Sequence, residues 1–534
     1  MSLSLLLLSE AAPFQPVFAG VALATLVVAL TALARKLPVP SPILQVLAGL
    51  VLGFIPGLRV PELEPDLVFF FFLPPILWAA AFFTSVREFR QNLRPIGLLA
   101  VGLVFATSAV VAVTAHALLP GVPWAVAVAI GAIVSPPDAV AAAAIVSRLP
   151  VPRRVVVILE GESLVNDAAA LVLYRTAVAA AVTGVFSLGE AVVRFFIDAG
   201  VGVLVGILVG WLAIRIIRVT HDALAETLLT IAAPYFCWVV AESLHVSAVL
   251  ACVAGGVHVR QHFSTVVSPM SRLQSRAVWD LLVFVINALI FLILGLQFHA
   301  LLETVTASTL VSTLGTGAVI SVVAILVRLV WVPVATILPR RLSRRLRRDD
   351  PLPDRRAVAL VAWTGMRGIV SLAAALALPL TLAGGTPFPF RAEIILITMC
   401  VIMITLVLQG LTLTPIIRAF AFVPETHHRE EERHARREAL RRGAEALEDL
   451  SREPWAAPEE VAQLRHELRD RIQLHERHAG DVTTQRRLRR GILAAERRML
   501  VRLRNEGAIS DETLRELEEE LDHESVRVGV GLTS

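Results

Sequence analysis

Charged residues and cysteines are both scarce in this chain of 534 residues. Only 18% of the residues are Asp, Glu, Lys or Arg, whereas 56% are hydrophobic, which excludes an ordinary soluble globular protein. The three cysteines, Cys237, Cys252 and Cys400, lie in apolar runs without paired spacing or a neighbouring histidine cluster, so we expect neither a disulfide nor a zinc site. Motifs for ATP or a redox cofactor are absent from the sequence, and we expect no cofactor.

Apolar runs long enough to cross a hydrocarbon core of roughly 30 Å dominate the first four-fifths of the chain. They lie at about 15–34, 40–57, 66–83, 95–118, 123–147, 154–182, 190–218, 223–243, 246–259, 277–301, 308–338, 356–382 and 391–421. We therefore predict an all-α polytopic membrane protein with 13 transmembrane helices.

Basic residues gather on alternate connections between these runs. The clusters are Arg35/Lys36, Arg87–Arg94, Arg148–Arg154, Arg215/Arg218, Arg260–Arg276 and Arg340–Arg356. By the positive-inside rule this side is cytoplasmic, which places the N-terminus outside and the C-terminus inside the cell (plasma or inner) membrane. Topology thus accounts for the net charge of +4, and we expect no nucleic-acid partner.

The composition changes after Phe422 to one rich in Arg, Glu, Leu and His. We predict a membrane domain at 1–422 and a helical, cytoplasmic, regulatory tail at 423–534. Pro458, followed by two glutamates, predicts the start of a helix in this tail. The tail histidines favour a solvated helical surface, with a pH sensor as the alternative interpretation.

The strongest functional signal is the run Glu160–Asp167, three acids and an amide inside an apolar stretch. On a helix Glu162 and Asn166 share one face, and Ser163 and Asp167 share the neighbouring face. A charged side chain at the centre of a membrane costs at least roughly 2.5–3.5 kcal/mol, so such acids usually line a water-filled cavity and act on ions or protons. Polar contacts that only join helices are the alternative interpretation.

Two spans carry helix-breaking residues near their middle. The fifth contains Ser135-Pro136-Pro137-Asp138, whose prolines remove two backbone donors, and the twelfth has Gly365 and Gly368 on either side of Arg367. These interruptions occupy corresponding places in two halves of six helices, which indicates a transporter built from inverted repeats. We expect the freed carbonyls near Ser135, together with Asp138, to face the cavity.

The buried charges must be balanced. We predict that Arg367 pairs with Glu162, or alternatively with Glu160, and that this pair orients Asn166. Arg328, in the eleventh span, is interpreted as snorkelling to the cytoplasmic edge. Glu160 and Asn287 are candidates for lining the cavity. Pairing between helices is an equal alternative for Asn287, and for Glu242 it is the favoured interpretation, with cavity lining as the alternative.

These motifs together resemble the monovalent cation:proton antiporter-1 family, which includes bacterial NhaP-type Na+/H+ antiporters and animal sodium/proton exchangers. The matching elements are Leu73–Leu77, Ser135–Asp138, Gly161–Asp167, the helix of Asn287 and Gly365–Leu372. The resemblance implies a homodimer in which a moving core carries the fifth and twelfth helices, broken and crossed.

The resemblance also implies roles for individual residues. Asp167 would bind the cation or the proton, Ser163 would help to ligate Na+, and Asp138 would contribute from the unwound stretch. Asn166, where electrogenic relatives have a second aspartate, favours one-for-one exchange. Many members have a Glu shortly after the Leu-Pro-Pro element, where this chain reads Trp78-Ala79-Ala80, so ion affinity and selectivity stay open.

We therefore predict a secondary transporter, not an enzyme, that exchanges Na+ or Li+ for H+ electroneutrally, through competition of cation and proton for Asp167. A K+/H+ antiporter is the alternative within the same fold. From other classes, an intramembrane aspartyl protease with Asp138 and Asp167 as its dyad would need neither the buried arginine nor the paired helix breaks. A membrane sensor that no longer transports would not need the intact site residues.

Overall fold

The computed structural model describes residues 15–36, 40–54, 65–146, 149–184, 188–220, 222–304, 307–382, 385–422, 426–476 and most of 491–521. The chain divides into two compact units, residues 1–424 and 425–534. Their assignment as a membrane antiporter domain and a cytoplasmic regulatory tail stays a prediction.

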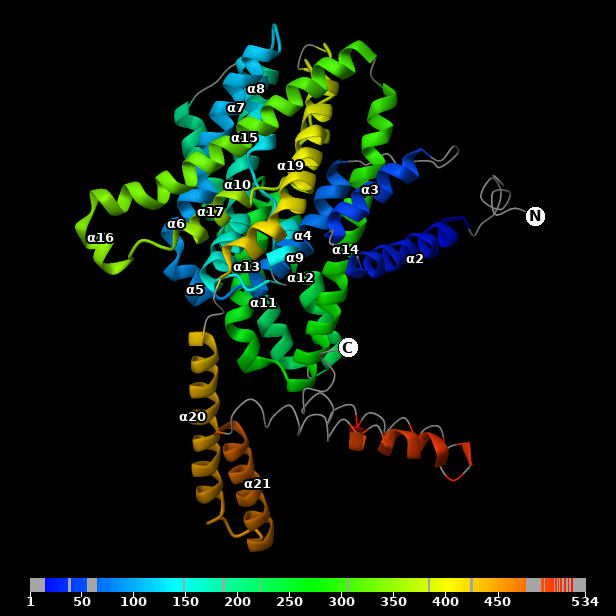
Figure 1. The fold of residues 1–534 in the computed structure, drawn as a ribbon, viewed down its shortest axis with the longest axis vertical. Helices are drawn as coiled ribbons and strands as arrows, with labels where there is room; N and C mark the ends of the chain where they lie inside the picture. Colours follow the sequence, from blue (N-terminus) through cyan, green and yellow to red (C-terminus); the bar gives the residue numbers. More distant parts are fainter. Residues whose placement is uncertain are drawn as a thin grey trace. The chain divides into compact units, whose positions relative to one another are not determined.

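The first unit is built from α-helices (Figure 1). Its elements are α2 (Gln15–Lys36), α3 (Ser41–Gly53), α4 (Pro65–Phe83), α5 (Val86–Gln91), α6 (Leu93–Gly97), the π-helix η1 (Leu98–Leu103), α7 (Val104–Leu118), α8 (Trp124–Val134), α9 (Ala139–Val146), α10 (Arg153–Thr183), α11 (Leu188–Thr220), α12 (Ala223–Ser243), α13 (Ala248–Val266), α14 (Pro269–Thr304), α15 (Ala307–Leu342), α16 (Arg344–Asp349), α17 (Arg355–Trp363), α18 (Ile369–Leu376) and α19 (Arg391–Phe420). In the described part of the chain, β pairing is confined to one isolated bridge between Thr381 and Pro387.

Six helical segments of the described chain are long and apolar enough to cross a membrane. They are Leu93–Leu118, Val193–Thr220, Ala223–Ser243, Ser271–Gln297, Leu310–Leu342 and Arg391–Phe420. The other expected spans also overlap helices, several of them shorter and apolar, such as Ser41–Gly53 and Trp124–Val134. The all-helical class is confirmed, while the count of 13 crossings and the orientation stay predictions.

Two helices are interrupted where the sequence predicted. Residues 135–138 separate α8 from α9, and residues 364–368 separate α17 from α18. The two interruptions contact one another, because the backbone amide of Asp138 donates a hydrogen bond to the carbonyl of Met366 at 2.7 Å. The unwound segments therefore lie against each other inside the bundle, where their backbone groups partly satisfy each other.

Glycines permit the closest helix crossings around this centre. A Cβ on Gly49 of α3 would collide with the carbonyl oxygen of Leu292 in α14, and a Cβ on Gly295 would collide with that of Val46 in α3. This crossing brings α3 and α14 backbone to backbone, as small residues do in membrane bundles. It fixes one wall of the cavity described below.

In the second unit, α20 (Thr426–Leu450) and α21 (Pro458–Glu476) form a helical hairpin (Figure 1). The predicted helix start at Pro458 is confirmed. Across the hairpin, the Nε and Nη2 atoms of Arg465 donate to the two carboxylate oxygens of Glu448 at 2.8 and 2.9 Å.

Candidate functional site

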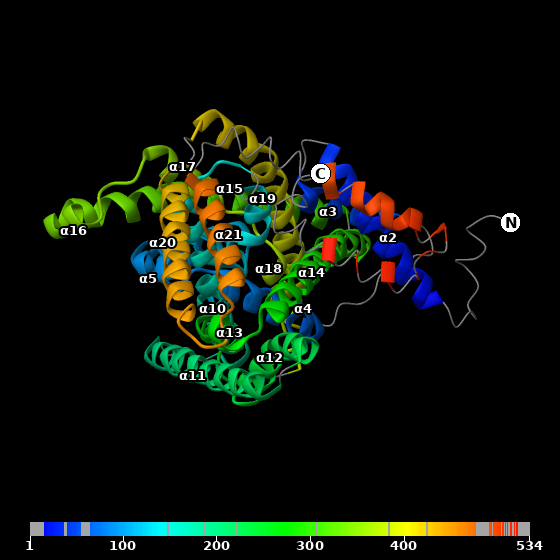
Figure 2. The same ribbon diagram turned by 90° about the horizontal axis from the view of Figure 1, so that it is seen from below.

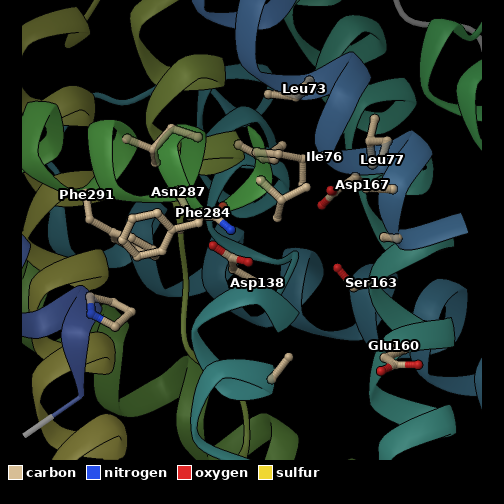
Figure 3. Close-up of a pocket in the computed structure, with 18 of the residues that line it drawn as sticks. Leu73, Ile76, Leu77, Asp138, Glu160, Ser163, Asp167, Phe284, Asn287 and Phe291 are labelled. Carbon is tan, nitrogen blue, oxygen red and sulfur yellow. The ribbon is translucent and has the colours of Figure 1, made fainter. Parts of the chain in front are cut away.

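A cavity of about 530 Å³ lies beside the crossing of the two interrupted helices. Its walls come from α2, α3, α4, α9, α10, α14, α18 and the two breaks, α8–α9 and α17–α18. The polar side chains that line it include Asp138, Glu160, Ser163, Asp167 and Asn287 (Figure 3). All but Asn287 lie in the two motifs predicted from the sequence to form the site, Ser135–Asp138 and Glu160–Asp167.

One face of α10 supplies three of these side chains. Glu160, Ser163 and Asp167 follow one another at helical spacing, and Figure 3 shows them along the same side of the cavity. Asp167 is 7% exposed and lies beside Leu77 of α4 (Figure 3), whereas Glu160 lies closer to the start of α10. A carboxylate and a hydroxyl one helical turn apart are hard oxygen ligands of the kind that suit a small cation.

Asp138 enters the cavity from the α8–α9 break. Its backbone is held by the hydrogen bond to Met366, and its carboxylate lies against Gly368. A Cβ at Gly368 would collide with the carboxylate of Asp138, so only glycine at this position leaves room for that carboxylate. Asp138 and Asp167 thus reach the same cavity from different elements (Figure 3).

Asn166 lies behind this face and does not line the cavity. It is fully buried, and its Nδ2 atom donates to the carbonyl oxygen of Pro137 at 2.8 Å. That carbonyl is free to accept because it lies in the non-helical stretch. Asn166 therefore ties α10 to the break and positions Asp167 relative to Asp138.

The predicted partner of Glu162 is wrong. Arg328 of α15, 1% exposed, donates from Nη1 and Nη2 to the two oxygens of Glu162 at 2.5 and 2.8 Å, and its Nε donates to the carbonyl of Val361. The interpretation of Arg328 as a snorkelling residue is wrong for the same reason. Arg328 precedes Arg340 by twelve residues, about 18 Å along a helix, so its guanidinium cannot reach the helix end.

Arg367 has a different role from the predicted one. Its Nε donates to the carbonyl of Val134 at 3.1 Å, and its Nη1 donates to the carbonyl of Gly365. In an unbroken helix the Val134 carbonyl would accept from the amide of Asp138, which here bonds to Met366 instead. Arg367 thus satisfies the C-terminal end of α8, where the helix dipole favours a positive charge.

The structure also shows whether the three remaining candidate residues line the cavity or form other contacts. Ser135 is buried, donates to the carbonyl of Ala132 at 3.1 Å and does not line the cavity. Glu242 pairs with Arg175 at 2.9 Å, which is the structural role favoured for it. Asn287 lines the cavity.

The α4 wall is apolar where many relatives were expected to carry a Glu. Leu77, Ala79 and Ala80 line the cavity, whereas Trp78 is fully buried on the other side of α4. A Cβ at Gly255 of α13 would lie 2.7 Å from the Trp78 ring, so the indole fills space between α4 and α13. These three residues of the α4 wall therefore contribute no acid to the cavity.

The cavity extends from Asp167 toward the helix ends that adjoin basic connections. Ser41 at the start of α3, Thr84 just after α4 and Asp280 in the first turns of α14 line this part. In the opposite direction along α10, residues 168–170 and Tyr174 are buried. Sequence reasoning missed Asp280, because only the rotation of α14 shows that this acid faces the cavity.

Residues 22–419 match a family model described as sodium/hydrogen exchanger, transmembrane. An uncharacterized Na+/H+ exchanger of Mycobacterium tuberculosis is 34% identical over 526 residues, which cover 95% of each chain. A sodium, potassium, lithium and rubidium/H+ antiporter of Bacillus pumilus is 32% identical over 497 residues, covering 90% of this chain and 73% of that relative. Among solved structures, the sodium proton antiporter MjNhaP1 from Methanocaldococcus jannaschii at pH 8 has a TM-score of 0.58 at 20% identity, covering 74% of this chain and 98% of that chain. This likeness shows a shared fold.

Proposed function

The chain belongs to the sodium/hydrogen exchanger family, and from this premise we propose that it exchanges Na+ or Li+ for H+ by competition of the two ions for Asp167. Family membership confirms the resemblance seen in the sequence. It also supports cation/proton exchange, and not an enzymatic reaction, as the activity of the protein. The observation that carries the finer proposal is the shared cavity of Asp167, Ser163 and Asp138 at the crossing of two broken helices.

The mechanism follows from the chemistry of one carboxylate. Asp167 binds either a proton or a cation, and the arrival of either displaces the other. Ser163 lies one turn away on the same face and supplies a neutral oxygen ligand, while Asp138 faces the site from the break. Movement of the core between the two sides then exchanges one cation for one proton, and the loaded site carries the same net charge in both directions.

The direction in which the cavity opens supports an inward-facing state. The side that carries the basic connections is cytoplasmic by the positive-inside rule. The cavity reaches the ends of α3, α4 and α14 on that side. In this conformation Asp167 therefore exchanges its ion with the cytoplasm.

Potassium is the second candidate ion, favoured by the name of the Bacillus pumilus relative, which includes sodium, potassium, lithium and rubidium. The apolar α4 wall of Leu77, Ala79 and Ala80 offers no further charged ligand. With one carboxylate and one hydroxyl named as ligands, the remaining ligands are backbone oxygens and water, which discriminate weakly between ions of similar charge.

Reconstituted proteoliposomes test the proposal. A pH gradient is imposed, and its collapse on addition of Na+, Li+, K+ or Rb+ is followed with a pH-sensitive dye, with and without a clamped membrane potential. We expect exchange by the wild type that is indifferent to the potential, and none by Asp167→Asn. Asp280→Asn is the matched control, because it removes an exposed carboxylate that lines the same cavity.

Three outcomes separate the parts of the proposal. If Asp167→Asn still exchanges at the rate of the control, competition at Asp167 is refuted. If exchange depends on the clamped potential, the one-for-one stoichiometry is refuted while exchange stands. If K+ or Rb+ collapses the gradient as well as Na+ does, the ion selectivity must be revised.

The setting of this exchange is part of the proposal. We place the protein in the cell membrane as a homodimer, with residues 423–534 as a cytoplasmic regulatory tail. The basic connections support the orientation, and the family resemblance supports the dimer. Cross-linking in native membranes and protease accessibility of the tail in inside-out vesicles test these two points separately.

A further inference from the structure

A second cavity, of about 170 Å³, lies between the C-terminal parts of α11 and α13, apart from the one that holds Asp167. It is lined by Trp211, Ile214, Arg215, Arg218, His258 and His262. The proposed exchange mechanism uses none of these residues. Four of these six described side chains are arginine or histidine, and none of the six is a carboxylate.

Helical spacing and a glycine crossing produce this cluster. Three pairs, Trp211/Arg215, Ile214/Arg218 and His258/His262, are each four residues apart and thus share a helix face. Earlier along α11, Cβ atoms at Gly202 and Gly206 would collide with backbone oxygens of α13. The parallel helices are pressed together there, and the large side chains of the following turns hold a space open between them.

Among the described residues, carboxylates do not neutralise the positive charges of the cluster. In the part of the chain that the structure describes, neither Arg215 nor Arg218 forms an ion pair with a carboxylate. Asp222, close by in sequence, is engaged as the cap of α12, where it accepts from the amide of Ala225 at 2.8 Å. The His262 Nδ1 atom contacts the carbonyl of His258 at 3.0 Å, which directs its Nε2 atom to the other side of the ring.

We propose that this cavity binds the phosphate group of an anionic lipid headgroup. The two guanidinium groups match phosphate oxygens as bidentate donors, and the imidazoles add further N–H donors. A volume of about 170 Å³ corresponds to several water molecules of roughly 30 Å³ each, so a phosphate group and part of its ester linkage fit. Basic pockets between membrane helices on the cytoplasmic side suit lipid phosphates in particular.

The surroundings of the cavity favour a lipid over a free phosphate ion. Figure 2 shows α11 at the outer edge of the helical bundle. Its side chains Leu212, Ile216 and Val219 are exposed large apolar groups next to the cavity, where acyl chains would lie. Arg215 is five residues before the end of α11, about 8 Å along the helix, which is the depth of the headgroup region.

The test measures lipid binding and does not depend on ion exchange. Wild-type protein, Arg215→Gln/Arg218→Gln and Arg344→Gln/Arg347→Gln are purified in a neutral detergent. The last variant is the matched control, because it removes the same charge from exposed arginines of α16 on another basic connection. Each protein is titrated with phosphatidylglycerol, phosphatidylcholine or inorganic phosphate, and lipid retention by native mass spectrometry and the thermal midpoint are recorded.

We expect phosphatidylglycerol to bind the wild type and the α16 control and to raise their thermal midpoints, and to bind Arg215→Gln/Arg218→Gln at least tenfold more weakly. Arg215→Lys/Arg218→Lys, which retains the charges, should recover part of the binding. The proposal is overturned if Arg215→Gln/Arg218→Gln binds phosphatidylglycerol as the wild type does, or if the α16 control loses binding to the same extent. If inorganic phosphate gives the same arginine-dependent shift as the lipid, the cavity is a phosphate-ion site and the lipid assignment is overturned.

Discussion

The pairing of Glu162 with Arg328 gives a prediction about stability that the alternative pairing with Arg367 does not. Both groups are 1% exposed, and two hydrogen bonds of 2.5 and 2.8 Å join them. Removing one partner of a buried ion pair leaves an uncompensated charge, which costs roughly 3–5 kcal/mol. We therefore expect Arg328→Met and Glu162→Gln each to lower the free energy of unfolding by about that amount.

The double variant discriminates between the two pairings. Once Glu162 is neutral, loss of the Arg328 charge removes an unpaired cation, so Glu162→Gln/Arg328→Met should be much less destabilised than the sum of the single variants. The coupling free energy should reach roughly 2–3 kcal/mol, near the upper end for directly contacting residues. The corresponding cycle for Glu162 and Arg367 should give a markedly smaller value.

Unfolding is followed by tryptophan fluorescence while a denaturing detergent is titrated into protein in a mild detergent. The control cycle uses Arg175 and Glu242, whose ion pair at 2.9 Å has side chains 50% and 41% exposed and should be worth at most about 1 kcal/mol. A coupling between Glu162 and Arg328 no larger than this control, with a larger coupling between Glu162 and Arg367, would refute the observed pairing.

Three further predictions concern single positions. Ser163→Ala should raise the Na+ concentration for half-maximal exchange about fivefold, the effect of roughly 1 kcal/mol for one lost neutral ligand, as measured by dye quenching in proteoliposomes. Gly368→Ala should lower the exchange rate roughly 10²-fold, because the added Cβ displaces the carboxylate of Asp138. Gly315→Ala is the control, because a Cβ at Gly315 meets open space. Equal losses of exchange rate in the two variants would contradict the explanation. In the tail, hydrogen bonding from Arg465 lowers the pKa of Glu448 below its usual 4.5. The contact therefore stabilises the α20–α21 hairpin fully above pH 4.5, and this stabilisation is lost as the pH falls through the lowered pKa of Glu448. Hydrogen exchange of the full chain should show protection of the hairpin that decreases on acidification in the wild type and is already reduced at neutral pH in Glu448→Gln.

Local sequence signals were sufficient to predict the parts of the site that depend on local structure. The paired prolines at 136 and 137 lie in the predicted break between α8 and α9, whereas the pair at 74 and 75 lies inside the continuous helix α4. The four-residue spacing of Ser163 and Asp167 places both on one face of α10. These features follow from backbone chemistry within a few residues. The helical class and the helix interruptions were therefore predictable from the chain alone.

The partner of Glu162 was not predictable in the same way. Two buried arginines with identical chemistry compete for one carboxylate, and the choice depends on how α15 packs against α10. The signal that was overlooked is depth, since Arg328 lies too far from the end of α15 to reach water. Asp280 shows the same limit, because its contact with the cavity depends on the rotation of α14.

The observed pairing changes the charge balance of the core in a way that bears on stoichiometry. Glu162 is neutralised by Arg328, and the formal charges of Arg367, at the end of α8, and Asp138 cancel in the sum. In the proposed mechanism, Asp167 then carries the exchanged charge. The five groups Glu162, Arg328, Arg367, Asp138 and Asp167 then sum to zero when Asp167 holds a proton or a monovalent cation, and to one negative charge when Asp167 is empty; Glu160 and Asp280, which line the same cavity, are not included in this sum. Moving an uncompensated charge through a membrane is costly, so the empty core moves poorly and the loaded core moves in both directions. In the proposed mechanism the two arginines thus favour one-for-one exchange, whereas an Arg328 at the membrane edge would leave the other four groups with a net negative charge when Asp167 is loaded.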